Sequence, residues 1–369
     1  MYRSKFHTQS GLSLIELMIA MVVGLILMAG VLSIFLSSRQ SYGINSAVAR
    51  IQENGRFALN FLRTDARNAG YMGCATSTTT ASYLNPVADN LPYNFAQAIY
   101  GFHFTGTVPG PTENPAPDTN ATDWTPNLDP YLTGKVLPNT DVLVVRFAQR
   151  DPIYITTITS PTATSATVNT LLGASDQPAL APGDLFLASN CLSAIVLQAT
   201  SATSGTTLEY TSGGSAPGNN GEVIPQSFVG AMVVSPTTAV FYIGQGADTS
   251  PALFKASTDT TQPGGFSTQE MVSGVENMRV LYGVDLTGSQ VPSEYVTADV
   301  VDAANEWADV VSVRIGLLVR SNTAAVPLPS MASDFALVDS SVENPVTAPL
   351  DTRMRQIFIA TVGIRNSLP

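Results

Sequence analysis

Residues 11–36 read GLSLIELMIAMVVGLILMAGVLSIFL, and this stretch decides the fold. Apart from Glu16, none of these residues carries a charge. As an α-helix, the 25 residues that follow the glycine extend roughly 37 Å, which is longer than the hydrocarbon core of a bilayer at about 30 Å. The stretch is therefore predicted to be a membrane-spanning helix.

Glu16 is a lone carboxylate within this apolar run. A charge at membrane depth costs on the order of 2–4 kcal/mol on insertion scales, so it needs a partner, and a free α-amino group is the nearest candidate. Cleavage after Gly11 would create such a group at Leu12, one helical turn before Glu16 and on the same helix face. A single chain pairs the two poorly because the first turn can point its amine away. Two chains offset along a shared axis can pair them well.

The leader MYRSKFHTQSG is polar and basic, and it ends directly before the apolar run. An ordinary secretory signal is cut after its apolar region. A cut at the glycine instead removes the leader and keeps the membrane helix.

Residues 11–16, Gly-Leu-Ser-Leu-Ile-Glu, resemble the class III signal of type IV pilins and pseudopilins, which is usually written G, then F/L/M-[ST]-L-[IV]-E. Every position matches. In that family the prepilin peptidase, a membrane aspartyl protease, cuts after the glycine and N-methylates the new terminus. The resemblance implies cleavage between Gly11 and Leu12, methylation of Leu12, and a role for Glu16 in assembly through a neighbour's amine. A plain signal anchor is the alternative.

The helical pattern continues beyond Leu36 but changes character. Small and apolar residues recur at spacings of three and four, namely Ile44, Val48, Ile51, Gly55, Ala58, Leu62 and Ala66. Arg67 suits the last turn of a helix, and Gly70 suits the position just after it. We predict one helix from about residue 12 to 69, with a break near 37–43 as the alternative.

From residue 71 onward the pattern is typical of β-structure. Strands are predicted at 141–147, 240–243, 311–319 and 356–365, and a hairpin at 278–296 turns at 285–288. Asn220-Gly221 is typical of a type I′ turn. The tracts 106–130 and 200–221, rich in Ser, Thr, Pro and Gly, are predicted to be long surface loops. A division of the β-rich region near 230–265 stays open.

The predicted fold class is therefore α+β, a long N-terminal helix packed on a large, mainly antiparallel, β-rich globular head. Its segments are a leader (1–11), a transmembrane and assembly helix (12–36), an amphipathic continuation of that helix (37–70), and a head in the periplasm or outside the cell (71–369).

Charged residues make up only 12% of the chain, and the net charge is −11. An acidic surface repels phosphate backbones, so no direct nucleic-acid binding is expected. Solubility alone explains the acidity.

Cys74 and Cys191 are the only cysteines. The head of a membrane-anchored chain of this type would lie in the periplasm, where disulfides persist, so we expect these two residues to be bonded. Two free thiols are the alternative.

The sequence offers little catalytic or metal-binding chemistry. Its two histidines are His7, in the leader, and His103, which lies between aromatic residues and is expected to be packed or on an edge strand. The residues from Asp118 onward begin like a calcium loop, but Asp123 stands where that loop needs glycine. We expect no catalytic residue, metal site or cofactor. A Ser-His-Asp site around His103 and a carboxylate-only glycosidase are the enzymatic alternatives.

Further segments resemble PilW-type minor pilins, a family akin to pseudopilin J of type II secretion. They are residues 52–59, 67–74, 274–285, 307–320 and 353–366. The resemblance implies a minor pilin in a tip or priming complex, which serves pilus assembly and hence twitching, adhesion or DNA uptake. Its partners would be the prepilin peptidase, other minor pilins, the major pilin and, before assembly, inner-membrane lipid. The head would lie in the periplasm first and at the pilus tip on the cell surface later.

Two other functions are the alternatives. One is a type II secretion pseudopilin, and the other is an anchored periplasmic binding or adhesive module that never polymerises. Glu16 separates the polymer from the anchored module, because only a polymer has a use for its charge.

Overall fold

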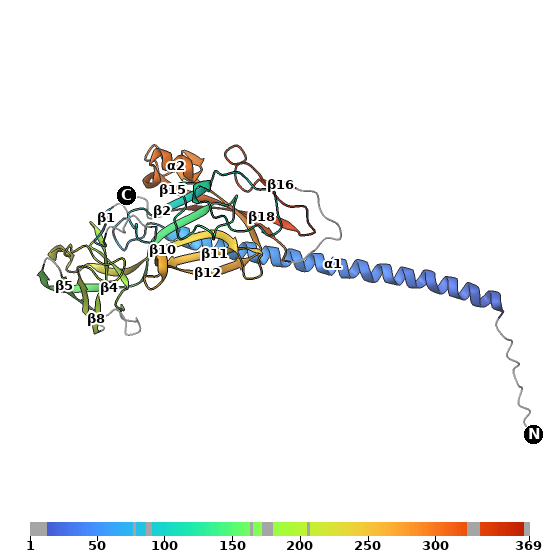
Figure 1. Cartoon of the computed structure of the whole chain (residues 1–369), viewed down its shortest axis with the longest axis horizontal. Coiled ribbons are helices and arrows are strands. Elements are labelled where there is room, and N and C mark those ends of the chain that lie inside the picture. Colours follow the sequence, from blue (N-terminus) through green and yellow to red (C-terminus); the bar gives the residue numbers. More distant parts are fainter. Residues whose placement is uncertain are drawn as a thin grey trace, which may run out of the picture.

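A single long helix forms the stem of the molecule (Figure 1). The computed structural model describes residues 13–76, 79–85, 91–162, 165–171, 180–204, 207–322 and 333–364. Helix α1 (Leu14–Asn68) runs without interruption through residues 37–43, so the alternative of a break there is wrong. Gly70 follows the helix at φ 76°, the left-handed conformation that ends many helices.

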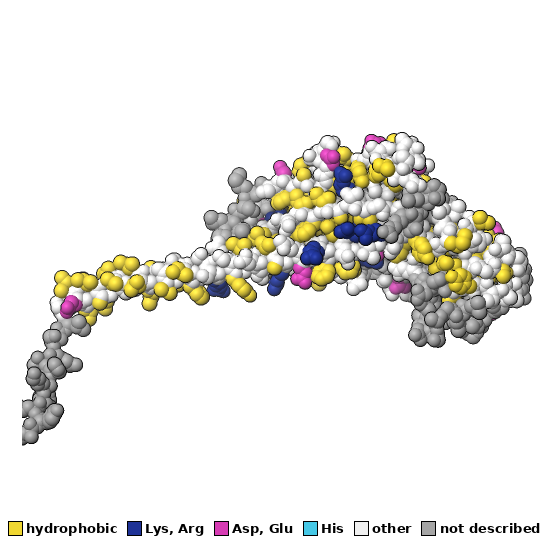
Figure 2. All heavy atoms as spheres, turned by 180° about the vertical axis from the view of Figure 1, so that it is seen from behind, with side chains coloured by type: hydrophobic (Ala, Val, Ile, Leu, Met, Phe, Trp, Pro, Cys, Tyr) yellow, Lys and Arg dark blue, Asp and Glu magenta, His cyan; other side chains and the backbone are white. Residues whose placement is uncertain are grey.

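The first half of α1 projects from the head and packs against no other described element (Figures 1 and 2). Its large apolar side chains are exposed, from Leu14 at 78% to Leu36 at 55%. Its mean hydropathy reaches 2.8, and by length and composition it can cross a membrane. The exposed apolar surface has a physical explanation if lipid surrounds it.

The second half of α1 lies against the head through one face. The buried residues of that face are Ala47, Ile51, Gly55, Ala58, Leu62, Asp65 and Ala66. These residues follow the predicted stripe, because small and apolar side chains at helical spacing allow close approach of a sheet. Four of them, Ile51, Ala58, Leu62 and Ala66, belong to the largest hydrophobic core of the molecule.

Within the described residues, twelve strands form the large sheet, and β1 with β7 is its one parallel pair. They are β1 (Thr80–Ser82), β2 (Ile99–Phe104), β3 (Trp124–Thr125), β4 (Val142–Thr162), β5 (Ser165–Leu171), β6 (Leu185–Ser189), β7 (Ala194–Gln198), β8 (Ser201–Ser204), β9 (Thr207–Thr211), β10 (Met232–Gln245), β11 (Pro251–Thr258) and β12 (Phe266–Ser273). The central path runs β1-β7-β6-β10-β4-β5-β9-β8, and β11 carries β12 beyond β10.

The small sheet has the order β14-β13-β15-β18 and is antiparallel throughout. Its strands are β13 (Val275–Val284), β14 (Glu294–Val296), β15 (Val310–Arg320) and β18 (Arg355–Gly363). A short helix, α2 (Ala298–Ala304), and a two-stranded ribbon of β16 (Asp334–Phe335) and β17 (Val346–Thr347) complete the described head.

Gly274 carries the chain from the large sheet into the small one. It lies between β12 and β13 at φ 77°, and a Cβ there would stand 2.9 Å from the Arg320 carbonyl oxygen. Only glycine combines that conformation with so close an approach. The two sheets therefore meet at a sharp corner.

Helix α1 packs against both sheets, over β18, β15 and β13 of the small sheet and over β4 and β12 of the large one. On one flank, Asn54 Nδ2 donates to the Ser273 carbonyl oxygen of β12 at 3.0 Å, and Lys255 of β11 binds Asp65 at 2.7 Å. On the other flank, Gly55 packs against Phe358 of β18. Adjacent helix residues thus contact the last strand of each sheet.

The predicted α+β class and its antiparallel head are confirmed. The predicted strands overlap β4, β10, β15 and β18, with Asp141 just before β4 and Ile364 just after β18, and the hairpin is β13 with β14. Arg365 lies outside the described residues. A boundary near 230–265 is not found, because β10 lies at the centre of the large sheet between β4, β6 and β11.

Two local predictions are wrong. Asn220-Gly221 forms no hairpin turn, since its neighbour Asn219 pairs with the backbone of Gln198 and forms a bridge to Gly213. The tract 200–221 contains β8 and β9. In the tract 106–130, residues 106–123 include no buried residue, as expected of a surface loop, but Trp124 is fully buried and pairs with β2, so the end of the tract enters the core.

Replacing Gly55 by alanine tests the contact between α1 and β18. A Cβ at that position would stand 2.4 Å from Phe358 Cε2, so the head must repack at a cost of about 1–3 kcal/mol. Gly43→Ala is the matched control, because nothing lies within 4 Å of a Cβ there and alanine favours the helix by about 1 kcal/mol. In thermal unfolding of the detergent-solubilised chain, Gly55→Ala should lower the midpoint and Gly43→Ala should not. Equal midpoints for the two variants would contradict this packing.

Candidate functional site

Glu16 lies in the first turn of α1 and is bound within its own chain. Glu16 Oε2 accepts the Ser13 backbone N–H at 3.1 Å, and the Ser13 carbonyl oxygen accepts the Leu17 N–H at 3.2 Å. The carboxylate thus satisfies a backbone donor at the positive end of the helix dipole. Gly11 and Leu12, the predicted cleavage and methylation positions, lie outside the described residues.

The second oxygen of Glu16 remains available to a neighbour. Among the described residues, the Glu16 side chain makes one hydrogen bond, to the Ser13 backbone N–H through Oε2. It is also the only charge in the exposed apolar half of the helix, and Figure 2 shows acidic atoms at the tip of an otherwise apolar stem. The arrangement can present one anionic oxygen to an ammonium group of another chain while the helix start stays capped.

Cys74 and Cys191 meet just beyond the end of α1. Their Sγ atoms are 2.12 Å apart and their Cα atoms 4.5 Å apart, which is disulfide geometry. Nearby, the Ala75 N–H donates to Ser189 Oγ at 3.0 Å. The bond therefore joins the segment that leaves the helix to the turn between β6 and β7.

The pairing of Cys74 with Cys191 stays a prediction that peptide mapping checks. Closing a loop of 117 positions contributes about 4–5 kcal/mol in the chain-entropy model. Non-reducing digests of the native protein should contain the linked peptides, and a Cys74→Ser/Cys191→Ser variant should unfold at lower temperature. Two alkylatable thiols in protein from the oxidising compartment would contradict the bond.

His103 belongs to a buried ion-pair cluster that joins the two sheets. Its Nδ1 lies 3.0 Å from Asp141 Oδ1, and its Nε2 lies 3.4 Å from Glu343 Oε2. Arg279 of β13 binds the same two carboxylates, at 3.2 Å and 3.5 Å. The Val280 N–H donates to Asp141 Oδ2 at 2.9 Å. Asp141 and Glu343 each contact both His103 and Arg279, so they connect β2 of the large sheet to β13 of the small sheet.

The pKa values of the two carboxyl groups in this cluster shift in opposite directions. Burial alone would raise the pKa of Asp141, but Arg279, His103 and the Val280 N–H hold that pKa below its usual value. Burial raises the pKa of Glu343, and its longer contacts with Arg279 and His103 do not reverse the shift. Burial would lower the pKa of His103, but the hydrogen bond and charge of Asp141, with the charge of Glu343, outweigh burial and raise it.

This geometry favours a structural role for His103. Both ring nitrogens face carboxylates, so neither is free to take a proton from a substrate. Among the described residues, no group of three or more His, Cys, Asp and Glu side chains is arranged to hold a metal ion.

From the ion pairs of His103 we predict that their contribution to the free energy of unfolding of the head is larger at about pH 5.5 than at about pH 8.5. Because the pKa of His103 is raised on folding above its unfolded value of about 6.5, its stabilisation is complete below that pH and is lost as pH rises through the folded pKa. The difference in unfolding midpoint between the native chain and His103→Gln should shrink from about pH 5.5 to about pH 8.5. His7→Gln, in the predicted leader, is the control. A difference that stays constant with pH would contradict the assignment.

A second charged cluster closes the other end of the small sheet. Arg355 of β18 binds Glu276 at 2.6 Å, and Arg320 of β15 lies 3.6 Å from the same carboxylate. Arg353 Nε donates to Glu113 at 2.8 Å. Glu113 comes from the tract before β3, so these contacts fix a long loop against the ends of two strands.

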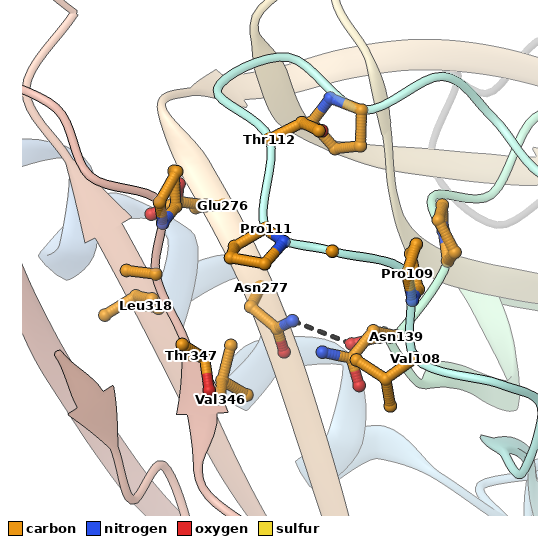
Figure 3. Close-up of a pocket in the computed structure, with 15 residues that line it drawn as sticks. Val108, Pro109, Pro111, Thr112, Asn139, Glu276, Asn277, Leu318, Val346 and Thr347 are labelled. Carbon is orange, nitrogen blue, oxygen red and sulfur yellow. Dashed lines mark hydrogen bonds between the residues drawn. The ribbon is translucent and has the colours of Figure 1, made fainter. Parts of the chain in front are cut away.

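That loop forms one wall of a pocket of about 310 Å³ (Figure 3). Residues 108–115 face Leu318 and residues 346–349 across it, with Asn277 between them. Asn277 Nδ2 donates to the Asn139 carbonyl oxygen at 2.7 Å. The volume is at the lower end of the range of about 300–1,000 Å³ that ligand pockets occupy. Prolines dominate the lining, and its one acid, Glu276, is already bound by arginine.

The structure does not bring the predicted site residues together. Glu16 lies near the free end of the stem, whereas Cys74 and Cys191 lie in the head. Sequence reasoning missed both charged clusters, although a signal was present. Arg279 and Asp141 each stand in or beside an apolar run, where a charge must be paired.

Comparison with known proteins gives two family matches. Residues 240–366 match the family described as Type IV Pilus-assembly protein W, and residues 6–32 match the Prokaryotic N-terminal methylation motif. No curated protein matches the chain significantly. Among solved structures, a type IV-like pilin from Thermus thermophilus shares 13% identity and a TM-score of 0.24, over 60% of this chain and 87% of the other. A TM-score of that size supports no inference about the head.

Proposed function

We propose that this chain, whose family matches support a type IV pilus minor pilin of the PilW family, works in the complex that primes pilus assembly and then stays at the pilus tip. In this proposal the prepilin peptidase cuts after Gly11 and methylates Leu12. The stem is held in the inner membrane with the head in the periplasm, and assembly carries the head to the cell surface. Other minor pilins and the major pilin are its partners. The role is structural, and we propose no catalytic step.

The observation that carries the proposal is the placement of Glu16. It is the single charge in an exposed apolar stem, and it lies one turn from the amine that cleavage would create. In the bilayer little water competes with an ion pair, so a contact between Glu16 and a neighbour's amine would be stronger than a surface pair. A helix that served only as an anchor would be more stable in the membrane without this charge.

The size of the head supports a place at the tip. A pilus shaft repeats its subunits at a short axial step, so each head must fit beside the next. The described residues between 71 and 364 form two sheets and a ribbon, gathered as a bulky head at one end of the stem (Figure 1). At the tip, such a head has free space above it.

Glu16→Gln tests the assembly role of the charge. The substitution keeps the shape and part of the hydrogen bonding but removes the charge, so insertion and cleavage should continue while recruitment of partners fails. Mass spectrometry of the membrane-extracted protein should show N-methyl-Leu12 for both the native chain and the variant. Co-purified pilins and sheared pili should fall severalfold for the variant in a strain without the native copy.

Glu53→Gln is the matched control, because this exposed residue lies on the same helix outside the apolar run. It should leave piliation unchanged. Normal partner recovery and normal piliation for Glu16→Gln would remove the role assigned to the carboxylate, and an intact Met1 in cells with active peptidase would remove the processing step.

A further inference from the structure

Strand β18 is an unusually regular edge of the small sheet. Its nine residues pair with β15 from Arg320↔Arg355 to Ser312↔Gly363 without a bulge. Five other ladders, β10–β4, β11–β12, β13–β15, β4–β5 and β8–β9, have register shifts. In the described sheet no strand pairs with the other side of β18. A full strand length of backbone is therefore open to another strand.

Hydrogen bonds at the two ends of β18 show which residues face outward. Just before it, the Ser321 N–H donates to the Met354 carbonyl oxygen at 2.9 Å, and just after it, the Ile364 N–H donates to the Val311 carbonyl oxygen at 2.9 Å. In an antiparallel ladder, residues that bond to the neighbouring strand alternate with residues that do not. The even-numbered residues of β18 thus bond to β15. Ile357, Ile359, Thr361 and Gly363 direct both backbone groups to the free edge.

This edge lacks the devices that usually prevent strand pairing. Residues 356–363 contain no charge and no proline, and Ile359 is 53% exposed. The last strand of the large sheet, β12, instead exposes Gln269 and Glu270. Charges, prolines and bulges are the common protections of edge strands in soluble proteins. Because residues 356–363 lack these protections, the edge of β18 is suited to pairing with another strand.

We propose that the free edge of β18 is a docking site for an extended strand of a different pilin subunit, added to the small sheet next to Ile357–Gly363. The inference rests on the proposed function, because it requires a neighbouring pilin head. Outward N–H and C=O groups need partners of complementary kind along their whole length, and only an extended backbone supplies them. An apolar side chain opposite Ile359 would complete the contact.

The direction of the strand argues against a second copy of this chain as the partner. β18 ends shortly before the C-terminus, which lies at the end of the head remote from the N-terminus (Figure 1), so the strand runs away from the membrane as α1 does. Subunits anchored in one membrane have parallel α1 helices. Antiparallel pairing of β18 with β18 would point two stems in opposite directions. β14, at the other edge of the small sheet, runs in the required direction but has only three residues, too few to cover Ile357–Gly363. A longer strand that runs towards the membrane in a different subunit meets the edge without that conflict.

Proline substitution along β18 tests the proposal with an internal control. Thr361→Pro removes an outward N–H and places its ring at the edge, while the bonds to β15 remain. Thr361→Ala keeps the N–H. Ala360→Pro removes an inward N–H, so it should lower the unfolding midpoint of the full-length protein in detergent, whereas Thr361→Pro should leave it close to that of Thr361→Ala.

We expect Thr361→Pro to be processed normally but to reduce co-purified partner pilins and sheared pili roughly tenfold. A photo-reactive benzoylphenylalanine at position 359 of the full chain, irradiated in piliated cells, should join β18 to a strand of another pilin. Cross-linking to a second copy of this chain would overturn the choice of partner. Normal piliation and partner recovery for Thr361→Pro, in a strain that loses pili without this chain, would overturn the docking edge alone. Normal pili in the strain that lacks this chain would overturn the proposed function itself.

Discussion

One helix has to satisfy two surroundings, and the rest of the structure follows from that constraint. The first half of α1 is apolar on all sides, whereas the second half is apolar on one face only. The change occurs without a break in the backbone, so the position of the membrane is transmitted to the head as a rigid stem. The head therefore has to pack against a helix whose sequence the membrane also constrains. It does so by packing both sheets against α1.

The helix contacts the edge strand of each sheet. Asn54 and Gly55 are neighbours in the helix, yet one contacts β12 and the other packs against β18. The β12 edge carries a charge and polar side chains, while the β18 edge carries neither a charge nor a proline, so only one of the two is prepared for a partner.

Charged residues connect the sheets and the helix beside the hydrophobic core that they share. The cluster around His103 joins β2 to β13, and Lys255 with Asp65 joins β11 to the helix. Buried ion pairs contribute little net stability compared with an apolar core, but loss of one partner is strongly destabilising. Their main effect here is to specify one relative position of the two sheets, because each carboxylate accepts bonds from separate elements.

The sequence predicted those features that depend on local periodicity. The stem, the buried stripe through Gly55 and the strand at 311–319 were all found, since each has a repeat of about 3.6 or 2 residues. The turn at Asn220 was wrong because tertiary bonds of Asn219 override a local preference. The pairing of His103 with Asp141 and Glu343 could not be foreseen. These residues lie far apart in the chain, and only the order of the strands brings them together.

For the candidate site, the pattern identified the residues but not their local contacts. The motif around Glu16 marked the carboxylate, yet its bond to the Ser13 N–H depends on where the helix begins. The free edge of β18 had no sequence signal of its own, because an edge strand and a central strand with the same alternation look alike. Which strand lies at an edge is a property of sheet order.

Glu16 and the β18 edge together offer more to an assembly than either does alone. From Glu16 to Gly55, which packs on β18, the helix rises about 58 Å, so the two contact points lie far apart along one rigid stem. A contact at a single point leaves a subunit free to tilt and rotate. A second contact at that distance fixes both its axial offset and its rotation, and it forms at the high effective concentration that the first contact provides. An ion pair in the membrane and a strand in the head can therefore each be weak and still place the subunit in one position.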